Sequence, residues 1–226
     1  MMAVKNVYAF EEQFIDVLVP NFPPYTYKDN NEFQGIGIEQ ARKIFEQAGI
    51  TASYQLAPNY GKIVHSVKHG KGDAFLLASQ NDERDQIAKF SQPVMVNRWS
   101  WYVLNDSQVS PHSSNFKSQA RVSTHFNANT HKWLTKHGYD VKPAMGTVNL
   151  PEMLLLKRVD AVFIAELVFE QALAKNNISP TLFKKYVEVE KDFCIYVSNT
   201  YLNKFPETLT KINKAITTLK NANSNK

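Results

Sequence analysis

The stretch TASYQLAPNYGKIVHSVKHGKGDAFLLA, residues 51–78, contains three predicted elements in succession. Thr51–Leu56 predicts a strand. Tyr60–His69 places its apolar residues on one face at helical spacing, and Gly70 follows at the expected helix end. Asp73–Ala78 is a short apolar run that predicts a buried strand. A strand, a helix and a second strand in this order indicate a parallel βαβ unit.

The same alternation continues on both sides of this stretch. Upstream, Phe14–Pro20 predicts a buried strand, and Glu39–Ala48 predicts a helix that ends at Gly49. Downstream, a long β-rich segment precedes a polar loop, after which strands and helices alternate again. The expected downstream strands are 95–104, 121–124, 141–144, 160–164, 186–189 and 193–197, and the expected helices are 130–137, 150–158, 166–175 and 206–219. The sequence therefore predicts an α/β chain built from two alternating halves.

The composition excludes several classes of protein. Of 226 residues, 43% are hydrophobic and 21% charged, which is typical of a soluble globular chain. The net charge is +5, but the lysines are scattered, so we expect no nucleic-acid partner. No apolar run approaches the roughly 20 residues of a membrane span. The single cysteine, Cys194, lies in an apolar run and is expected to be a buried, inert thiol.

Short motifs follow one another in an order that resembles a known family. Phe22–Tyr25 is an aromatic-Pro-Pro loop after the first strand, and Gly35–Glu39 leads into a helix. Asp82–Arg84 is followed by Phe90, Ser91 and Pro93, and Arg158–Val162 reads RVDAV. In order and spacing, these motifs resemble the family-3 extracellular solute-binding proteins, the polar-amino-acid binders of ABC uptake systems, over residues 14–220.

The resemblance implies an α/β fold with two lobes, the periplasmic-binding-protein type II fold, in which two crossover strands join the lobes and the ligand cleft lies between them. We expect lobe I to comprise residues 14–98 plus 196–226, and lobe II residues 103–190. The implied function is capture of an amino acid or related small carboxylate by lobe closure, for ABC-type uptake, with no catalysis, cofactor or metal. The implied partners are the small-molecule ligand and an ABC permease, and we expect a monomer. Residues 1–6 do not resemble a signal peptide, so we expect either a cytoplasmic protein or one whose export signal has been removed. The resemblance implies the second, and hence the periplasm.

Arg84 is the leading candidate for a ligand contact. A guanidinium presents a planar pair of donors that matches a carboxylate, and the resemblance implies that Arg84 grips the α-carboxylate of the ligand. The alternative is a surface arginine that pairs with Asp82 or Asp85. Ser79 matches a position where the family places a hydroxyl against the ligand, although a serine in a loop can equally stabilise a turn.

Phe22 and Tyr60 match family positions whose aromatic rings pack against the side chain of the ligand. Aromatic faces also attract cations. The alternative for both residues is ordinary core packing. Tyr60 follows Asn59 directly at a predicted helix start, which favours an exposed position.

Two further candidates lie before the predicted helix of the second half. The N-terminus of a helix offers unpaired N–H groups to an anion, and the family holds the carboxylate there with a Gly-Thr-Thr or Gly-Ser sequence. This chain has Asn127 and Ala128 at the corresponding positions, followed by Asn129 and Thr130. Asn129 and Thr130 are therefore candidate ligand contacts, with a simple N-cap as the alternative.

One position departs from the family pattern. After the strand at 160–164, amino-acid binders carry an acidic residue that takes the α-ammonium group, and this position falls on Ala165. Glu166 is the next candidate for that role, with an acid in the first turn of a helix as the alternative. If Glu166 does not reach the ligand, the ligand is a carboxylate without a standard amine or a modified amino acid.

Other functions stay open on the sequence alone. An enzyme similar to the periplasmic cyclohexadienyl dehydratases would need a general acid, for which Glu166 is the only obvious candidate. An orphan binder or a sensor input would bind its ligand without a transporter. A regulatory effector-binding domain would have to be a fragment, because no DNA-binding extension is present. His65 and His69 have helical metal-binding spacing but lack a third ligand, so we expect surface histidines.

Overall fold

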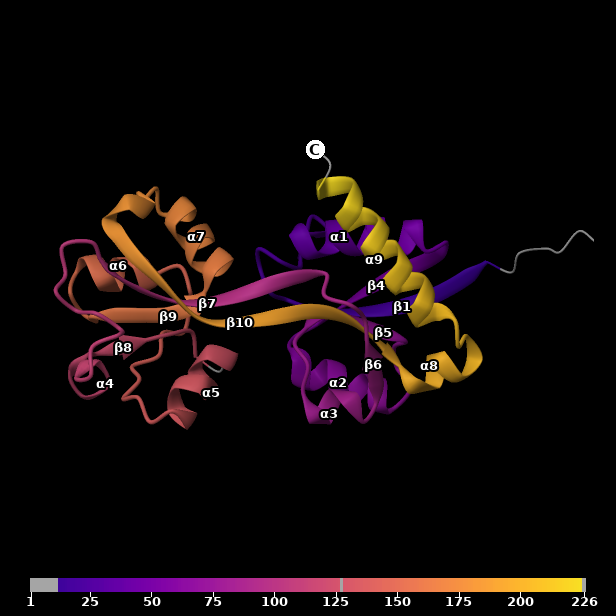
Figure 1. Cartoon of the computed structure of the whole chain (residues 1–226), viewed down its shortest axis with the longest axis horizontal. Coiled ribbons are helices and arrows are strands. Elements are labelled where there is room, and N and C mark those ends of the chain that lie inside the picture. Colours follow the sequence, from indigo (N-terminus) through magenta and orange to yellow (C-terminus); the bar gives the residue numbers. More distant parts are fainter. Residues whose placement is uncertain (1–11, 127, 225–226) are drawn as a thin grey trace, which may run out of the picture. The chain divides into compact units, whose positions relative to one another are not determined.

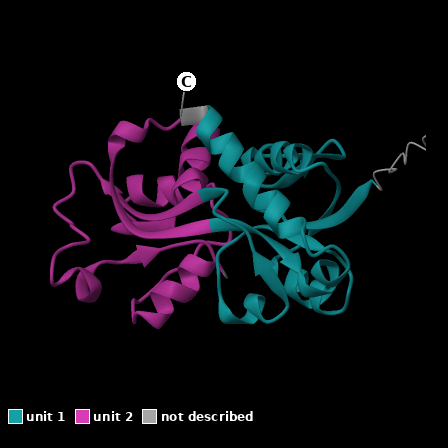
Figure 2. Cartoon of the chain, turned by 45° about the vertical axis from the view of Figure 1, so that its right-hand side comes forward, with its two compact units in different colours: residues 1–95, 193–226 teal, residues 96–192 magenta. Residues whose placement is uncertain are grey.

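The structure is a computed structural model that describes residues 12–126 and 128–224. It divides into two compact units (Figure 2). Unit 1 comprises Met1–Met95 and Phe193–Lys226, and unit 2 comprises Val96–Asp192. Strand β7 (Met95–Leu104) leads the chain into unit 2, and strand β10 (Phe183–Ser198) leads it back (Figure 1).

Unit 1 is built on a mixed sheet whose order is β4-β1-β5-β10. β1 (Gln13–Pro20) runs parallel to β4 (Ile50–Ala57) along its whole length and parallel to β5 (Ala74–Ala78) on its other side. β10 pairs antiparallel with β5 and with β6 (Ala88–Phe90). A separate hairpin joins β2 (Tyr27–Asp29) to β3 (Glu32–Gln34).

The helices of unit 1 cover both faces of this sheet (Figure 1). The chain crosses from β1 outward to β4 and then back over β1 to β5, so right-handed crossovers place the two connecting helices on opposite faces. The first connecting helix packs against the C-terminal helix, with a buried face formed by Ile38, Ala41, Ile44 and Phe45. The helices of unit 1 are α1 (Ile36–Gln47), α2 (Tyr60–Lys68), α3 (Asp82–Asp85), α8 (Asn199–Lys204) and α9 (Thr208–Ser224).

Unit 2 has a smaller sheet in which β9 (Ala161–Ala165) lies between β7 and β8 (Val122–Ser123). β9 is antiparallel to β7 and parallel to β8. Its helical elements are α4 (Phe116–Gln119), α5 (Asn129–Lys136), α6 (Leu150–Leu155), α7 (Glu166–Lys175) and the 3-10 helix η1 (Pro180–Leu182). None of the helices in the described ranges is long and apolar enough to cross a membrane.

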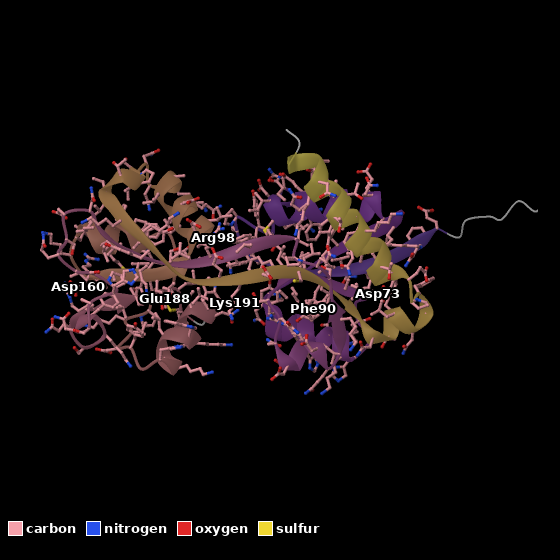
Figure 3. The ribbon with its side chains drawn as sticks, viewed as in Figure 1. Asp73, Phe90, Arg98, Asp160, Glu188 and Lys191 are labelled. Carbon is pink, nitrogen blue, oxygen red and sulfur yellow. The ribbon has the colours of Figure 1, made fainter. Side chains whose placement is uncertain are left out.

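Aromatic side chains form the core of unit 2. The Phe163 ring on β9 lies 4.6 Å from Trp101 and 4.9 Å from Trp133, measured between ring centroids. On the neighbouring strands, Arg98 forms an ion pair with Glu190, with 2.6 Å between Nε and Oε1. The Trp101 indole donates to Glu188 on β10 at 3.3 Å, and Figure 3 labels Arg98 and Glu188. Polar bonds and ring packing together hold β7, β9 and β10 in register.

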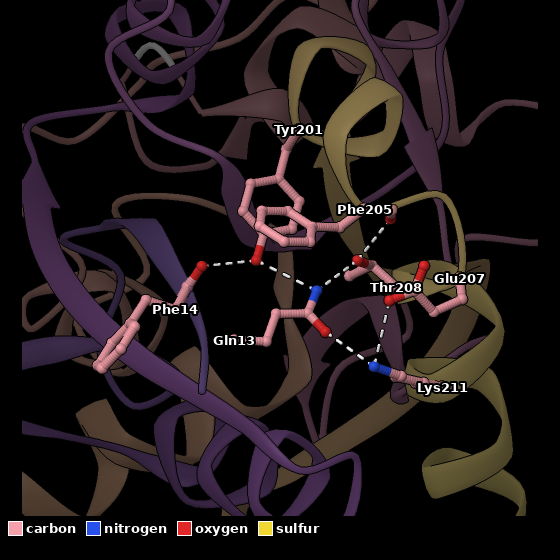
Figure 4. A network of polar contacts seen from close by, with 7 residues as sticks. All are labelled: Gln13, Phe14, Tyr201, Phe205, Glu207, Thr208 and Lys211. Carbon is pink, nitrogen blue, oxygen red and sulfur yellow. Dashed lines mark hydrogen bonds and ion pairs between the residues drawn. The ribbon is translucent and has the colours of Figure 1, made fainter. Parts of the chain in front are cut away.

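A buried polar network ties the start of β1 to the last two helices of unit 1 (Figure 4). The Gln13 amide donates to the Thr208 hydroxyl at 2.7 Å and to the Tyr201 hydroxyl at 3.2 Å. Its oxygen accepts a hydrogen bond from the Lys211 ammonium at 3.0 Å, and Tyr201 donates to the Phe14 carbonyl at 2.5 Å. Because Gln13 is only 6% exposed, every polar atom of its amide depends on these partners.

The sequence predicted most elements closely. The strand at 95–104 and the helix at 166–175 are confirmed at both ends. The two strands expected at 186–189 and 193–197 are a single strand, β10, so that prediction is wrong. The helix expected to reach Arg158 ends at Leu155, and Lys157 then adopts the left-handed region with φ 52°.

The strand expected at Val141–Ala144 is also not formed. This segment makes only two isolated bridges, Val122↔Val141 and His125↔Ala144. The Lys142 N–H still donates to the Val122 carbonyl of β8 at 2.9 Å, and the Ala144 N–H donates to the Thr124 carbonyl just after β8 at 2.8 Å. Because the Lys142 and Ala144 N–H groups point toward β8, the Pro143 nitrogen faces the outer edge of the sheet, where a proline removes no hydrogen bond to β8.

The network around Gln13 predicts a measurable loss of stability. Gln13→Ala should lower the free energy of unfolding by about 1–3 kcal/mol, because the buried hydroxyl groups and the ammonium lose their partner. Denaturant unfolding measures the change. Gln47→Ala, at an exposed position of α1, is the matched control and should change stability by less than about 0.5 kcal/mol. Equal effects of the two substitutions would contradict a structural role for the network.

Candidate ligand-binding site

The predicted site residues of unit 1 all follow the carboxyl ends of parallel strands. Phe22 follows β1, Tyr60 follows β4, and Ser79 follows β5. The pairing Pro20↔Ala57 aligns the ends of β1 and β4 at one edge of the sheet. In open α/β sheets this edge is where ligands bind, at the point where the strand order reverses. β1 is that point here, because its two parallel neighbours are reached by crossovers in opposite directions.

Arg84 is held in a buried position within the segment that follows β5. Arg84 is only 7% exposed. The Asn81 side chain begins α3 by accepting a hydrogen bond from the Arg84 N–H at 2.9 Å. The Arg84 Nη1 donates to the Ser79 carbonyl, and its Cζ lies 4.9 Å from the centroid of the Tyr60 ring. The structure thus brings Arg84, Ser79 and Tyr60 together.

The charge of Arg84 has no carboxylate partner among the described residues. The pairing with Asp82 or Asp85 that the sequence left open is not formed. The Asp85 carboxylate instead accepts from the Tyr196 hydroxyl at 2.9 Å and from the Gln80 amide at 2.7 Å. The Arg84 Nε is buried without a hydrogen-bond partner. A guanidinium has five N–H donors, and the Ser79 carbonyl engages only one of its nitrogens, Nη1.

The ring of Tyr60 packs against the Arg84 guanidinium. Its ring is partly buried against the core of unit 1, and its hydroxyl donates to the Leu77 carbonyl and, at 3.3 Å, to the Leu76 carbonyl. Burial raises the pKa of Tyr60 well above its ordinary value, and the neighbouring Arg84 cation opposes this rise. Tyr60 therefore remains neutral and offers its ring face to the guanidinium, a contact worth about 0.5–2 kcal/mol.

The backbone that receives the Tyr60 hydroxyl is strained. Leu77 is buried in β5 and has φ 53°, a left-handed conformation that is rare for a bulky side chain. It coincides with a register shift in the pairing of β5 with β10. Gly37 lies close to Leu77. A Cβ atom at Gly37 would come within 2.2 Å of the Leu77 side chain. Strained backbone of this kind is concentrated at functional sites.

Phe22 belongs to a small aromatic group in unit 1. Its ring stacks on Tyr25 with centroids 5.0 Å apart, and Tyr25 meets the edge of Phe193 at 5.3 Å. Tyr25 is buried, whereas Phe22 is partly exposed. The Phe22 and Tyr25 rings therefore form one aromatic wall whose outer member reaches the surface.

In unit 2, the structure contradicts the N-cap alternative for Asn129 and Thr130, which are the first two residues of α5. The N-cap is Ala128, which makes no side-chain cap, so neither Asn129 nor Thr130 has that role. The Thr130 hydroxyl is buried and lies 2.6 Å from the Thr124 hydroxyl. Asn129 is exposed, and Asn127 lies outside the described residues. Asn129 and Thr130 follow the carboxyl end of β8, as the unit 1 candidates follow theirs.

Ala165 is the last residue of β9, and Glu166 is the first residue of α7. Ala165 is buried and pairs with Trp99 on β7. The Glu166 carboxylate forms an ion pair with Lys185 on β10. Within the described residues of unit 2, the acid nearest the expected ammonium position therefore already has a cationic partner.

Sequence reasoning missed three residues that shape the unit 1 site. Asn81 fixes the loop, and an asparagine directly before a short helix is a recognisable N-cap signal. Tyr25 supports Phe22 and lay within the aromatic loop already noted. Leu77 carries the strained carbonyl, for which the sequence offers no signal, because a leucine in an apolar run predicts regular strand.

Comparison with known proteins places the chain in a family. Residues 16–225 match the bacterial extracellular solute-binding proteins, family 3. The chain belongs to this family. The resemblance inferred from the motifs is thereby confirmed. No curated protein matches the chain.

Solved structures share the fold of this family-3 protein. A histidine kinase sensor domain with similarity to periplasmic binding proteins has a TM-score of 0.73 and 18% identity, over 94% of this chain and 92% of that one. The GluR0 ligand-binding core from Nostoc punctiforme, in complex with L-glutamate, has a TM-score of 0.71 and 20% identity, over 92% and 94%. Holo ArgBP from T. maritima has a TM-score of 0.66 and 20% identity, over 92% and 90%. The predicted two-lobed α/β fold of periplasmic binding proteins is confirmed.

The contact between Gly37 and Leu77 predicts that this glycine is required. Gly37→Ala should destabilise the protein by about 1–3 kcal/mol, because the added methyl group overpacks a buried contact. Denaturant unfolding tests this, with Gly146→Ala as the control, since no atom lies within 4 Å of a Cβ at Gly146. A neutral Gly37→Ala would show that Leu77 has room to move and is not held in its strained conformation.

Proposed function

We propose that this family-3 protein captures an amino acid or a related small carboxylate, and that Arg84 grips the carboxylate of the ligand. The observation that carries the proposal is the buried guanidinium of Arg84, which has an unpaired Nε and no carboxylate partner within residues 12–126 and 128–224. A buried charge without a counter-ion is costly. A ligand carboxylate would supply that counter-ion through paired, charge-assisted hydrogen bonds.

The surroundings of Arg84 support the same proposal. The guanidinium is fixed by the Ser79 carbonyl on one side and the Tyr60 ring on another. Preorganisation reduces the entropy lost on binding, so more of the interaction energy appears as affinity. In the proposed complex Ser79 and Tyr60 position Arg84, and Phe22 contributes an aromatic surface for the body of the ligand.

Proteins of the same fold hold amino acids of different side-chain character. The GluR0 core was solved with L-glutamate, and an ancestral arginine-binding protein was solved with arginine and with glutamine. Acidic, basic and neutral side chains are all represented. The shared feature of these ligands is their amino-acid backbone, which supports a carboxylate clamp as the common element and leaves side-chain choice to the individual protein.

We assign a secondary role to unit 2. The backbone N–H groups at the start of α5, at Asn129 and Thr130, are suited to an anion. The Thr130 hydroxyl already has Thr124 as its partner, so the proposed contribution comes from the backbone. The Glu166 carboxylate binds the ammonium group of the ligand only if it binds the Lys185 ammonium at the same time. We therefore propose that recognition depends more on the carboxylate of the ligand than on its ammonium group.

In the proposed cycle the two units close around the ligand, and the loaded protein delivers it in the periplasm to an ABC permease. Closure of this kind uses a few hinge residues, and β7 and β10 are the two segments that connect the units. A catalytic role has less support, because the general acid that it needs would be Glu166, whose carboxylate is engaged by Lys185.

Calorimetric titration with a panel of amino acids and small carboxylates tests the proposal. We expect at least one ligand to bind, and Arg84→Ala to weaken its binding by about 2–5 kcal/mol, which is roughly thirtyfold to several thousandfold. Arg84→Lys retains the charge but loses the paired donors, and should also bind more weakly than the wild type.

Arg42→Ala is the matched control. Arg42 lies on α1 in the same unit, is exposed, and donates to the Phe33 carbonyl at 3.0 Å. Its loss should leave ligand affinity unchanged. Circular dichroism checks that each variant is folded. A ligand that binds Arg84→Ala as tightly as the wild type would remove Arg84 from the site and with it the carboxylate clamp. Turnover of prephenate or arogenate would instead support the enzyme.

A further inference from the structure

The exposed face of α2 carries only basic side chains among its charged residues. Four exposed basic residues lie on the helix and at its C-cap: Lys62, His65, Lys68 and His69. Lys71, two residues after His69, is also exposed. The sequence has no acidic residue from Tyr60 to Gly72. We call these five residues the basic face. It lies on the side of the unit 1 sheet that α2 and α3 cover (Figure 1).

The five basic groups act on one another. The rings of His65 and His69 lie 4.3 Å apart, and the His69 Nδ1 is 2.7 Å from the His65 carbonyl. The pKa of His65 is lowered by His69 first, then by a small loss of hydration, and then by the three lysines. No carboxylate contributes to this shift. The basic face is therefore a local concentration of positive charge.

The strands beneath α2 provide little compensation, and α3, which contacts α2 through Arg84 and Tyr60, carries Asp82, Glu83 and Asp85. Helix α2 packs on β1, β4 and β5, and the only charged residue in these three strands is Asp16. The Asp16 carboxylate accepts a hydrogen bond from the Ser53 hydroxyl. The nearby Asp73, labelled in Figure 3, accepts from the Asp16 N–H at 3.0 Å. Among the described residues, no ion pair involves a member of the basic face.

The character of this surface favours a lipid over a protein partner. The buried centre of a protein interface is usually rich in aromatic and apolar residues. No large hydrophobic side chain is exposed between Leu56 and Phe90. An anionic membrane surface requires only clustered positive charge, and each lysine near it strengthens binding about fivefold. Membership of an extracellular bacterial family makes the outer surface of a bacterial membrane the relevant one.

We propose that the basic face of α2 binds anionic phospholipid headgroups, and that it does so more strongly as the pH falls. Three lysines provide a charge that is constant near neutral pH. His65 adds charge only when the pH drops below its pKa, which the neighbouring cations lower, and the His69 ring lies beside it with 4.3 Å between the ring centroids. An anionic surface stabilises the protonated histidines, so protonation and binding reinforce each other. This association concentrates the protein at the membrane independently of its ligand.

Flotation with vesicles of phosphatidylcholine, with and without phosphatidylglycerol, tests the proposal with the whole chain. We expect binding only to the anionic vesicles, weaker at high salt and stronger at about pH 5.5 than at about pH 7.5. The triple variant Lys62→Gln/Lys68→Gln/Lys71→Gln should lose about a hundredfold in affinity. His65→Gln/His69→Gln should retain binding at the higher pH and lose its increase at the lower pH.

The matched control is Lys43→Gln/Lys89→Gln/Lys214→Gln, which removes the same charge from exposed positions elsewhere in unit 1. It should lose much less affinity than the basic-face variant. Equal losses would overturn the proposal, because net charge alone would then explain binding. Failure to bind anionic vesicles would also overturn it, as would tighter binding to an acidic polypeptide than to the vesicles. Ligand titration and thermal unfolding should be unchanged in every variant, which separates this result from the proposed function.

Discussion

A buried guanidinium, to which the described part of the chain offers no carboxylate, is the constraint on which the candidate site in unit 1 depends. Water would solvate Arg84 well, so its burial has to be stabilised by fixed dipoles and polarisable surfaces. The Ser79 carbonyl and the face of Tyr60 provide this stabilisation. Tyr60 can do so only while its hydroxyl is held by the carbonyls at the end of β5. The position of the Arg84 guanidinium therefore depends on the Tyr60 ring, and the position of that ring depends on the strained end of β5.

Topology explains why these groups meet. Parallel strands start and stop together, so residues that are far apart in sequence arrive at one edge of the sheet. In unit 1 this edge receives the segments after β1, β4 and β5, and in unit 2 it receives those after β8 and β9. The two halves of the chain repeat one design in which regular strands provide rigidity and the following loops provide chemistry.

The periodic parts of the fold were predictable because their signals are local. Tyr60–Lys68 buries Ile63, Val64 and Val67, as the helical spacing indicated. The misses have non-local causes. The stretch from Phe183 to Asp192 alternates weakly and is largely exposed, so it gave a broken strand signal, although its pairing with β7 makes it continuous.

The candidate site was predictable to a similar degree. The order of motifs pointed to Arg84, Ser79 and Tyr60, which the structure places in contact. The burial of Arg84, the positive φ of Leu77 and the engagement of Glu166 by Lys185 depend on tertiary packing. No local pattern of residues encodes these three features, because each requires a partner from a distant part of the chain.

Strand β10 contributes residues to both units, which has a consequence for the order in which the units fold during synthesis. Residues of this strand after Asp192 complete the unit 1 sheet beside β5, yet they are synthesised only after all of unit 2. Unit 2 is a continuous segment and can fold while the ribosome is still at work. Until Ser198 has emerged, the open side of β5 lacks its neighbour, and the strand that leads to Arg84 is exposed to mispairing. The residues proposed to bind the ligand thus belong to the unit that is completed last.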